Sequence, residues 1–196
     1  IGTAAVRNPD LVKEAAKNRH LSSPESRHRQ AVLACQMSCE AIEKGDQTEA
    51  KKQAKNALNL DNAFLPAALV LARHYAETGK VRKAAALAER LWAQEPHPAL
   101  AELYALAPEV GKPLDRVKAA ERLAGFNPGH IESDLAIARA ALDADLWGQA
   151  RKHLMSAGVD EPSARVCRMM ADLEEAEHGD VGKARQWLVR SSHAGP

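Results

Sequence analysis

Two cysteines, Cys35 and Cys39, have the side chains most suited to chemistry, and they stand four positions apart in a helical stretch. This spacing places both sulfur atoms on one helix face, where they could share a metal ion. A zinc site needs further ligands, and the sequence contains no Cys-x-x-Cys or His-x-x-x-His pair to supply them. A regular helix also holds such a pair poorly for a disulfide. We interpret both as small residues on a half-buried face, and we predict no metal, no cofactor and no enzymatic activity.

The composition excludes several classes of protein. With 27 basic and 26 acidic side chains, the net charge is +1, which gives no strong field for nucleic acid. The longest uncharged stretch, residues 62–72, is far shorter than the roughly 20 residues of a membrane-spanning helix. Three cysteines without a signal peptide favour a reducing compartment. Because the chain begins at Ile1, without a methionine, we expect it to be a piece of a longer protein.

A recurring turn organises the chain. Five helical stretches each end in a short turn, and the turns begin at Gly45, Gly79, Gly111, Asp145 and Gly179. Their separations are 34, 32, 34 and 34 residues. Five positions after each turn stands a small residue in four units, at Ala50, Ala84, Ala150 and Ala184, whereas Arg116 interrupts the series. A fixed period near 34 residues is typical of helix-turn-helix repeats.

The period and its small residues resemble the tetratricopeptide repeat, which implies an all-α fold, a right-handed superhelical solenoid of about five units. A leading segment, residues 1–30, contains a short helix over residues 9–18, and a helix start signal follows at residues 22–25. The array covers residues 31–196, in units 31–64, 65–96, 97–130, 131–164 and 165–196. Pro108 and Pro113 flank the turn of the third unit, so we expect a shortened first helix there.

Two stretches of the last units resemble the HemY-type proteins of proteobacteria. One starts at Pro128-Gly129-His130 and runs to Ala144, and the other covers residues 165–180. The resemblance extends over residues 27–196. It implies the soluble domain of a bacterial inner-membrane protein, on the reducing, cytoplasmic side, associated with tetrapyrrole (haem) biosynthesis and anchored by a segment outside this chain.

The resemblance to tetratricopeptide arrays also implies a concave groove, lined by the second, fifth, ninth and twelfth positions of each first helix. The predicted groove residues are Cys35, Cys39, Leu69, Arg73, Leu135, Arg139, Met169 and Leu173. In the third unit the same positions hold Pro98, Ala101, Ala105 and Pro108. The apolar members would anchor a partner segment, and Arg73 and Arg139 could each hold a carboxylate through a bidentate fork. The alternative is that both arginines pair with neighbouring acids.

One position beyond the groove row, an acid recurs in every unit, at Glu43, Glu77, Glu109, Asp143 and Glu177. Acids near the carboxyl end of a helix oppose its macrodipole, so helix stability does not explain them. They form either an acidic rim that selects basic partners or ordinary solvated helix ends.

These patterns predict a protein-protein interaction scaffold that captures an extended or helical segment in its groove. The partners would be other proteins, which the resemblance extends to enzymes of tetrapyrrole synthesis, with no nucleic acid and no membrane contact except through the absent anchor. One alternative is a porphyrin- or haem-binding carrier, with His74, His178, Met169 or Met170 as the axial ligand. Another is an array that forms oligomers through an exposed end.

Overall fold

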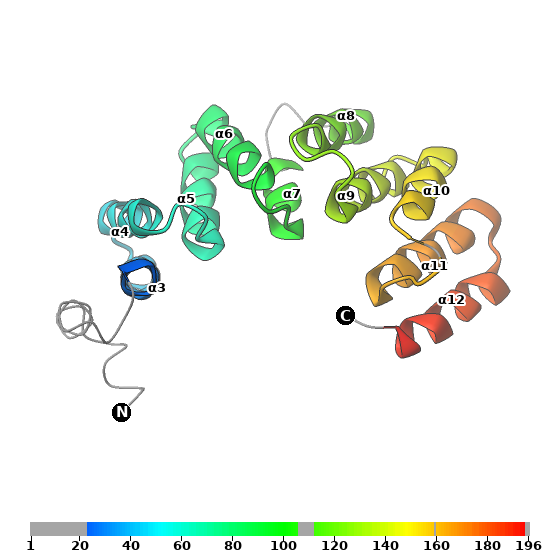
Figure 1. The fold of residues 1–196 in the computed structure, drawn as a ribbon. Coiled ribbons are helices and arrows are strands. Elements are labelled where there is room, and N and C mark those ends of the chain that lie inside the picture. Colours follow the sequence, from blue (N-terminus) through cyan, green and yellow to red (C-terminus); the bar gives the residue numbers. More distant parts are fainter. Residues whose placement is uncertain (1–22, 106–111, 159, 195–196) are drawn as a thin grey trace. The chain divides into compact units, whose positions relative to one another are not determined.

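A computed structural model of the 196-residue chain describes residues 23–105, 112–158 and 160–194, and these residues form ten α-helices. The helices follow one another as five hairpins (Figure 1). The pairs are α3 (Ser23–Glu43) and α4 (Gln47–Leu60), α5 (Leu65–Glu77) and α6 (Val81–Trp92), α7 (Pro98–Ala105) and α8 (Pro113–Ala124), α9 (Ile131–Leu142) and α10 (Trp147–Ser156), and α11 (Ala164–His178) and α12 (Val181–His193). No strand occurs in the described ranges, and the predicted all-α fold of tetratricopeptide-type hairpins is confirmed.

The turn inside a hairpin requires a left-handed backbone at one residue. Gly45, Gly79 and Gly179 have φ of 78°, 70° and 64°, and Asp145 takes the same role with φ 57°. A side chain is strained in this conformation, which favours glycine and, less strongly, Asp or Asn. A backbone hydrogen bond then closes the helix end, as between Lys80 N–H and the Tyr75 carbonyl at 2.7 Å. These residues explain why a turn recurs with the sequence period.

Aspartates start two of the second helices. The Asp46 carboxylate accepts hydrogen bonds from the amides of Thr48 and Glu49, at 3.1 and 3.0 Å. At the last hairpin, the carboxylate of Asp180 accepts from the Lys183 amide at 2.9 Å. Each aspartate satisfies amides that have no partner inside the helix, so the chain reverses and restarts within a few residues.

The recurring small residues lie where the two helices of a hairpin approach closely. Ala50, Ala84, Ala150 and Ala184 are all buried, with at most 4 % of their surface exposed. In the first hairpin the buried Ser38 hydroxyl donates to the Ala50 carbonyl at 2.6 Å, so a side chain of α3 reaches the backbone of α4. A larger side chain at these positions would push the helices apart.

The chain divides into two compact units, residues 1–91 and residues 92–196. In the first unit, α3 packs on α4 and α4 on α5. The second unit contains a hydrophobic core formed by α9, α10 and α11, against which Trp147 and Trp187 pack. The sequence predicted one continuous array of five repeats over residues 31–196, and these repeat boundaries stay a prediction.

A buried tryptophan joins the start of the second unit to α9. Trp92 is fully buried, and its indole N–H donates to the Ser133 hydroxyl at 3.1 Å. The Ser133 hydroxyl donates to the Asn127 backbone carbonyl at 2.8 Å, and the Asn127 side-chain amide donates to the Trp92 backbone carbonyl at 3.3 Å. Because every polar group of this circuit has a partner, the tryptophan is buried without an unsatisfied donor.

Two expectations concern helix ends. Helix α3 begins at Ser23, inside the start signal at residues 22–25 but ahead of residue 31, where the array was placed. Helix α7 is described over 8 residues, up to the start of residues 106–111, which the structure does not describe, so the shortened first helix expected for the third repeat stays a prediction. The leading helix predicted over residues 9–18 lies outside the described residues.

Candidate partner-binding pocket

Three of the predicted groove anchors belong to the core and cannot contact a partner. Leu135, Met169 and Leu173 expose 2 %, 1 % and 0 % of their surface, and all three lie in the cluster between α9, α10 and α11. The prediction is wrong for them because neighbouring hairpins cover that face of the first helix. Within the predicted row of α9, Arg139 is exposed and Glu132 is half-buried, whereas Leu135 and Leu142 belong to the core.

The predicted groove residues within residues 1–91, the first compact unit, have mixed surroundings. Leu69 is half-buried, whereas Arg73 and Cys39 are exposed. Cys35 is buried, and this burial, followed by the nearby Cys39, raises the pKa of its thiol to about 11. No group of three His, Cys, Asp or Glu side chains that could hold a metal ion occurs in the described part of the chain. Burial and the raised pKa both make the Cys35 thiol less reactive than the exposed Cys39 thiol.

The acids of the predicted rim do not share one environment. Glu43, Glu77 and Asp143 are exposed, and Glu109 lies outside the described residues. Glu177 is different, because its carboxylate binds Arg151 of α10. The prediction of a free acidic rim is wrong at this position, where the acid joins two hairpins.

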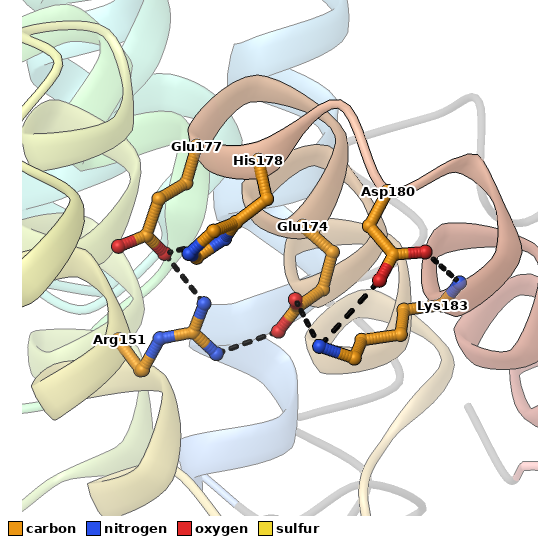
Figure 2. A network of polar contacts seen from close by, with 6 residues as sticks. All are labelled: Arg151, Glu174, Glu177, His178, Asp180 and Lys183. Atoms are coloured by element: carbon orange, nitrogen blue, oxygen red, sulfur yellow. Dashed lines mark hydrogen bonds and ion pairs between the residues drawn. The ribbon is translucent and has the colours of Figure 1, made fainter.

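Figure 2 shows the network around Glu177, which links α10, α11 and α12. The Arg151 guanidinium lies 2.6 Å from Glu174 Oε1 and 2.5 Å from Glu177 Oε2. Lys183 Nζ lies 3.9 Å from Glu174 and 3.5 Å from Asp180, and His178 Nδ1 lies 3.5 Å from Glu177.

These contacts shift the protonation equilibria of the network. The hydrogen bond from Arg151 lowers the pKa of Glu177, and the bonds to Glu174 and Glu177 raise the pKa of Arg151. The pKa of Asp180 is lowered, and the hydrogen bond from the backbone amide of Lys183 is the largest cause. Glu174 keeps only 6 % of its side chain exposed, and its ion pairs with Arg151 and Lys183 offset the cost of burying the carboxylate. We assign the network to the stability of the second unit.

A pocket of about 290 Å³ opens between α7, α8 and α9. Its floor consists of small residues, because six alanines line it: Ala101, Ala105, Ala119, Ala120, Ala136 and Ala140. The remaining lining residues are Pro98, Glu102, Tyr104, Arg116, Leu123, Arg139, Asp143 and Arg165. Pro98, Ala101, Ala105 and Arg139 are predicted groove positions, so the structure brings part of that row together around one cavity.

Three arginines line the pocket, and they differ in their partners. Arg165 lies 2.5 Å from Glu132. Arg139 lies 3.5 Å from Asp172, and the side chains of Arg139 and Asp172 are both exposed. Arg139 is therefore paired with a neighbouring acid, as the alternative prediction for this residue stated. Arg116 Nε is buried and has no hydrogen-bond partner among the described residues. A buried donor without an acceptor costs about 1–3 kcal/mol, so this atom is the exception in an otherwise satisfied set.

Sequence reasoning did not identify Arg116 as a functional residue. The signal was present, because Arg116 occupies the position that is alanine in the four other units. A long cation at a close-packing position implies local space around it, and the structure has a pocket there. The break in the small-residue series therefore marked the site.

The chain is similar in sequence to a curated protein. The chain is 35 % identical over 153 residues, 76 % of its length, to a protein of Magnetospirillum gryphiswaldense named probable magnetosome protein Mms48. The aligned part is 33 % of that relative, so the chain spans about a third of its length. No family model matches the chain. The resemblance to HemY-type proteins is not shown by these comparisons.

Among solved structures, the chain is similar to the crystal structure of MamA protein. The similarity has a TM-score of 0.44 at 14 % sequence identity, and it covers 84 % of this chain and 91 % of that one. None of the described helices combines the length and apolar character that crossing a bilayer requires.

Proposed function

We propose that this protein is an interaction scaffold that binds a segment of another protein at the pocket between α7, α8 and α9. The pocket itself carries the proposal: it has an alanine floor, charged groups at its margin and a buried donor without an acceptor. Arrays of helical hairpins typically bind through surfaces of this kind. The lining contains no Cys, His, Ser or Lys side chain.

The size of the pocket supports a side chain as its occupant. A volume of about 290 Å³ lies at the lower end of the range for small-molecule sites, roughly 300–1,000 Å³. One large apolar side chain of a bound segment fits this space, and the alanine methyl groups would supply its contacts. Exposed groups at the carboxyl end of α9, Arg139 and the following Asp143, would then contact polar parts of the same segment.

Under this proposal the partner is a protein, and the name of the relative suggests which proteins to test first. Its name connects that protein with the magnetosome, which favours a search among magnetosome proteins. A partner from tetrapyrrole synthesis and an inner-membrane location rest on the HemY resemblance alone and stay predictions.

The haem alternative gains no support from this pocket. No histidine, cysteine or methionine lines it. Met169 and Met170, two of the predicted axial ligands, are buried in the core at 1 % and 4 % exposure, and His178 is exposed beside Glu177. Iron ligation by either methionine would require the core to open.

Photo-crosslinking tests the proposal. We would replace Glu102, an exposed pocket residue, with p-benzoylphenylalanine, and use Glu175, exposed on α11 away from the pocket, as the matched control. A discrete protein adduct from position 102, absent from position 175, is expected in the source cell. Equal adducts from both positions, or none from 102, would contradict binding at this pocket.

A further inference from the structure

Arg116 is the one pocket residue whose burial leaves a donor unsatisfied. Its Nε–H is buried without a partner in the described ranges, although the other two pocket arginines each lie beside an acid. The Nε–H and a neighbouring Nη–H of a guanidinium form a side-on fork that fits the two oxygens of a carboxylate. Because this Nε–H is also closed to solvent, a carboxylate in the pocket satisfies it only if the Arg116 side chain turns toward the pocket on binding.

The charges around the pocket favour the same occupant. Three guanidinium groups line it against two carboxylates, those of Glu102 and Asp143. Arg139 and Arg165 keep their own partners, Asp172 and Glu132, neither of which lines the pocket. Among the three cations, Arg116 is therefore the one placed to accept a new anionic partner.

We propose that Arg116 reads an acidic residue of the bound partner segment, next to the apolar side chain that fills the alanine-lined pocket. This inference rests on the proposed function and deepens it, because it names the chemistry of the occupant: an apolar group that carries or adjoins a carboxylate. Arg116 is then a specificity residue, and its position explains why this unit lacks the alanine found at the equivalent position in the others.

A role in stability predicts a different result from a role in specificity. If Arg116 serves binding, then Arg116→Ala restores the small residue of the series, and the melting temperature should stay the same or rise. If Arg116 holds α8 in place, then the melting temperature should fall. Arg168→Ala, at an exposed position of α11, is the matched control.

The direct test uses two small probes, 4-phenylbutyrate and its neutral amide, 4-phenylbutanamide. Both offer the same apolar group, and only the first carries a carboxylate. Titration into the ¹⁵N-labelled chain is followed at the Arg116 Nε–Hε resonance and at the backbone amides of Ala119 and Ala136, which line the pocket. We expect the carboxylate to shift the Nε–Hε resonance and to bind at least about fivefold more tightly than the amide, which is about 1 kcal/mol.

The preference should disappear in Arg116→Gln and persist in Arg168→Gln. Equal affinity for both probes, with shifts at Ala119 and Ala136 only, would overturn the inference and leave the proposed function intact, since the pocket would still take an apolar group. Absence of any shift with either probe would also overturn it, whereas partner binding as such is decided by the crosslink from position 102.

Discussion

Removing Arg151 should destabilise the second unit strongly, because Arg151 neutralises a buried acid. Glu174 exposes only 6 % of its side chain and receives an Arg151 hydrogen bond at 2.6 Å. Leaving one member of a buried ion pair without its partner costs about 3–5 kcal/mol. Arg151 is itself 31 % exposed and Lys183 lies 3.9 Å from Glu174, so the loss should be smaller, about 2–3 kcal/mol for Arg151→Met.

Tryptophan fluorescence during urea unfolding measures this loss. The three tryptophans, Trp92, Trp147 and Trp187, all belong to the unit of residues 92–196, so the signal reports that unit. With a denaturant dependence of about 2 kcal/mol/M, the midpoint should fall by about 1 M. Methionine keeps much of the apolar stem of Arg151, so the change isolates the charge.

Two further variants make the prediction refutable. Arg168→Met removes an exposed arginine of α11 and should change stability by less than about 0.5 kcal/mol. Arg151→Met combined with Glu174→Gln removes both charges and should regain about 1 kcal/mol or more relative to Arg151→Met alone. If Arg151→Met is as stable as the Arg168→Met control, the network does not hold this unit together.

Three other outcomes follow from local features. The lowered pKa of Glu177 means that its contribution to stability is complete above its unfolded pKa, about 4.3, and is lost as the pH falls through the folded pKa. Between pH 6 and pH 3, the urea midpoint of Glu177→Gln should therefore fall less steeply than that of the unchanged protein. Gly179→Ala should lower the free energy of unfolding by about 1 kcal/mol, because φ is 64° at this residue. Gly148→Ala, inside α10 with open space around it, should raise it by about 0.5–1 kcal/mol. Equal effects of the two substitutions in thermal unfolding would contradict the assigned turn. Cys39 should react with a thiol reagent at pH 8 well before Cys35, whose pKa is about 11, and equal rates in single-cysteine variants would show that Cys35 is not buried.

The hairpins were predictable because each depends on local chemistry. A left-handed glycine such as Gly79, a capping aspartate such as Asp46 and a small residue such as Ala84 each act within a few positions of the chain. Their recurrence with one period sufficed to predict the fold class.

The accessible face of each first helix was not predictable in the same way. Whether Leu135 or Ala136 lines a pocket depends on how α8 and α10 cover α9, which is a tertiary property. The spacing rule gave Arg139 correctly as an exposed residue and Leu135 wrongly as another. Glu177 shows the same limit, because its partner Arg151 stands 26 positions away, on another helix.

The central claim is that the partner occupies the pocket between α7, α8 and α9. Its most direct test is the yield of the crosslink from position 102 after the pocket is filled by Ala120→Trp, compared with Ala176→Trp at an exposed position of α11. Circular dichroism establishes that both variants fold. The account predicts that the adduct is lost with Ala120→Trp and kept with Ala176→Trp. An adduct that persists at full yield in the folded Ala120→Trp variant would show that the partner binds elsewhere.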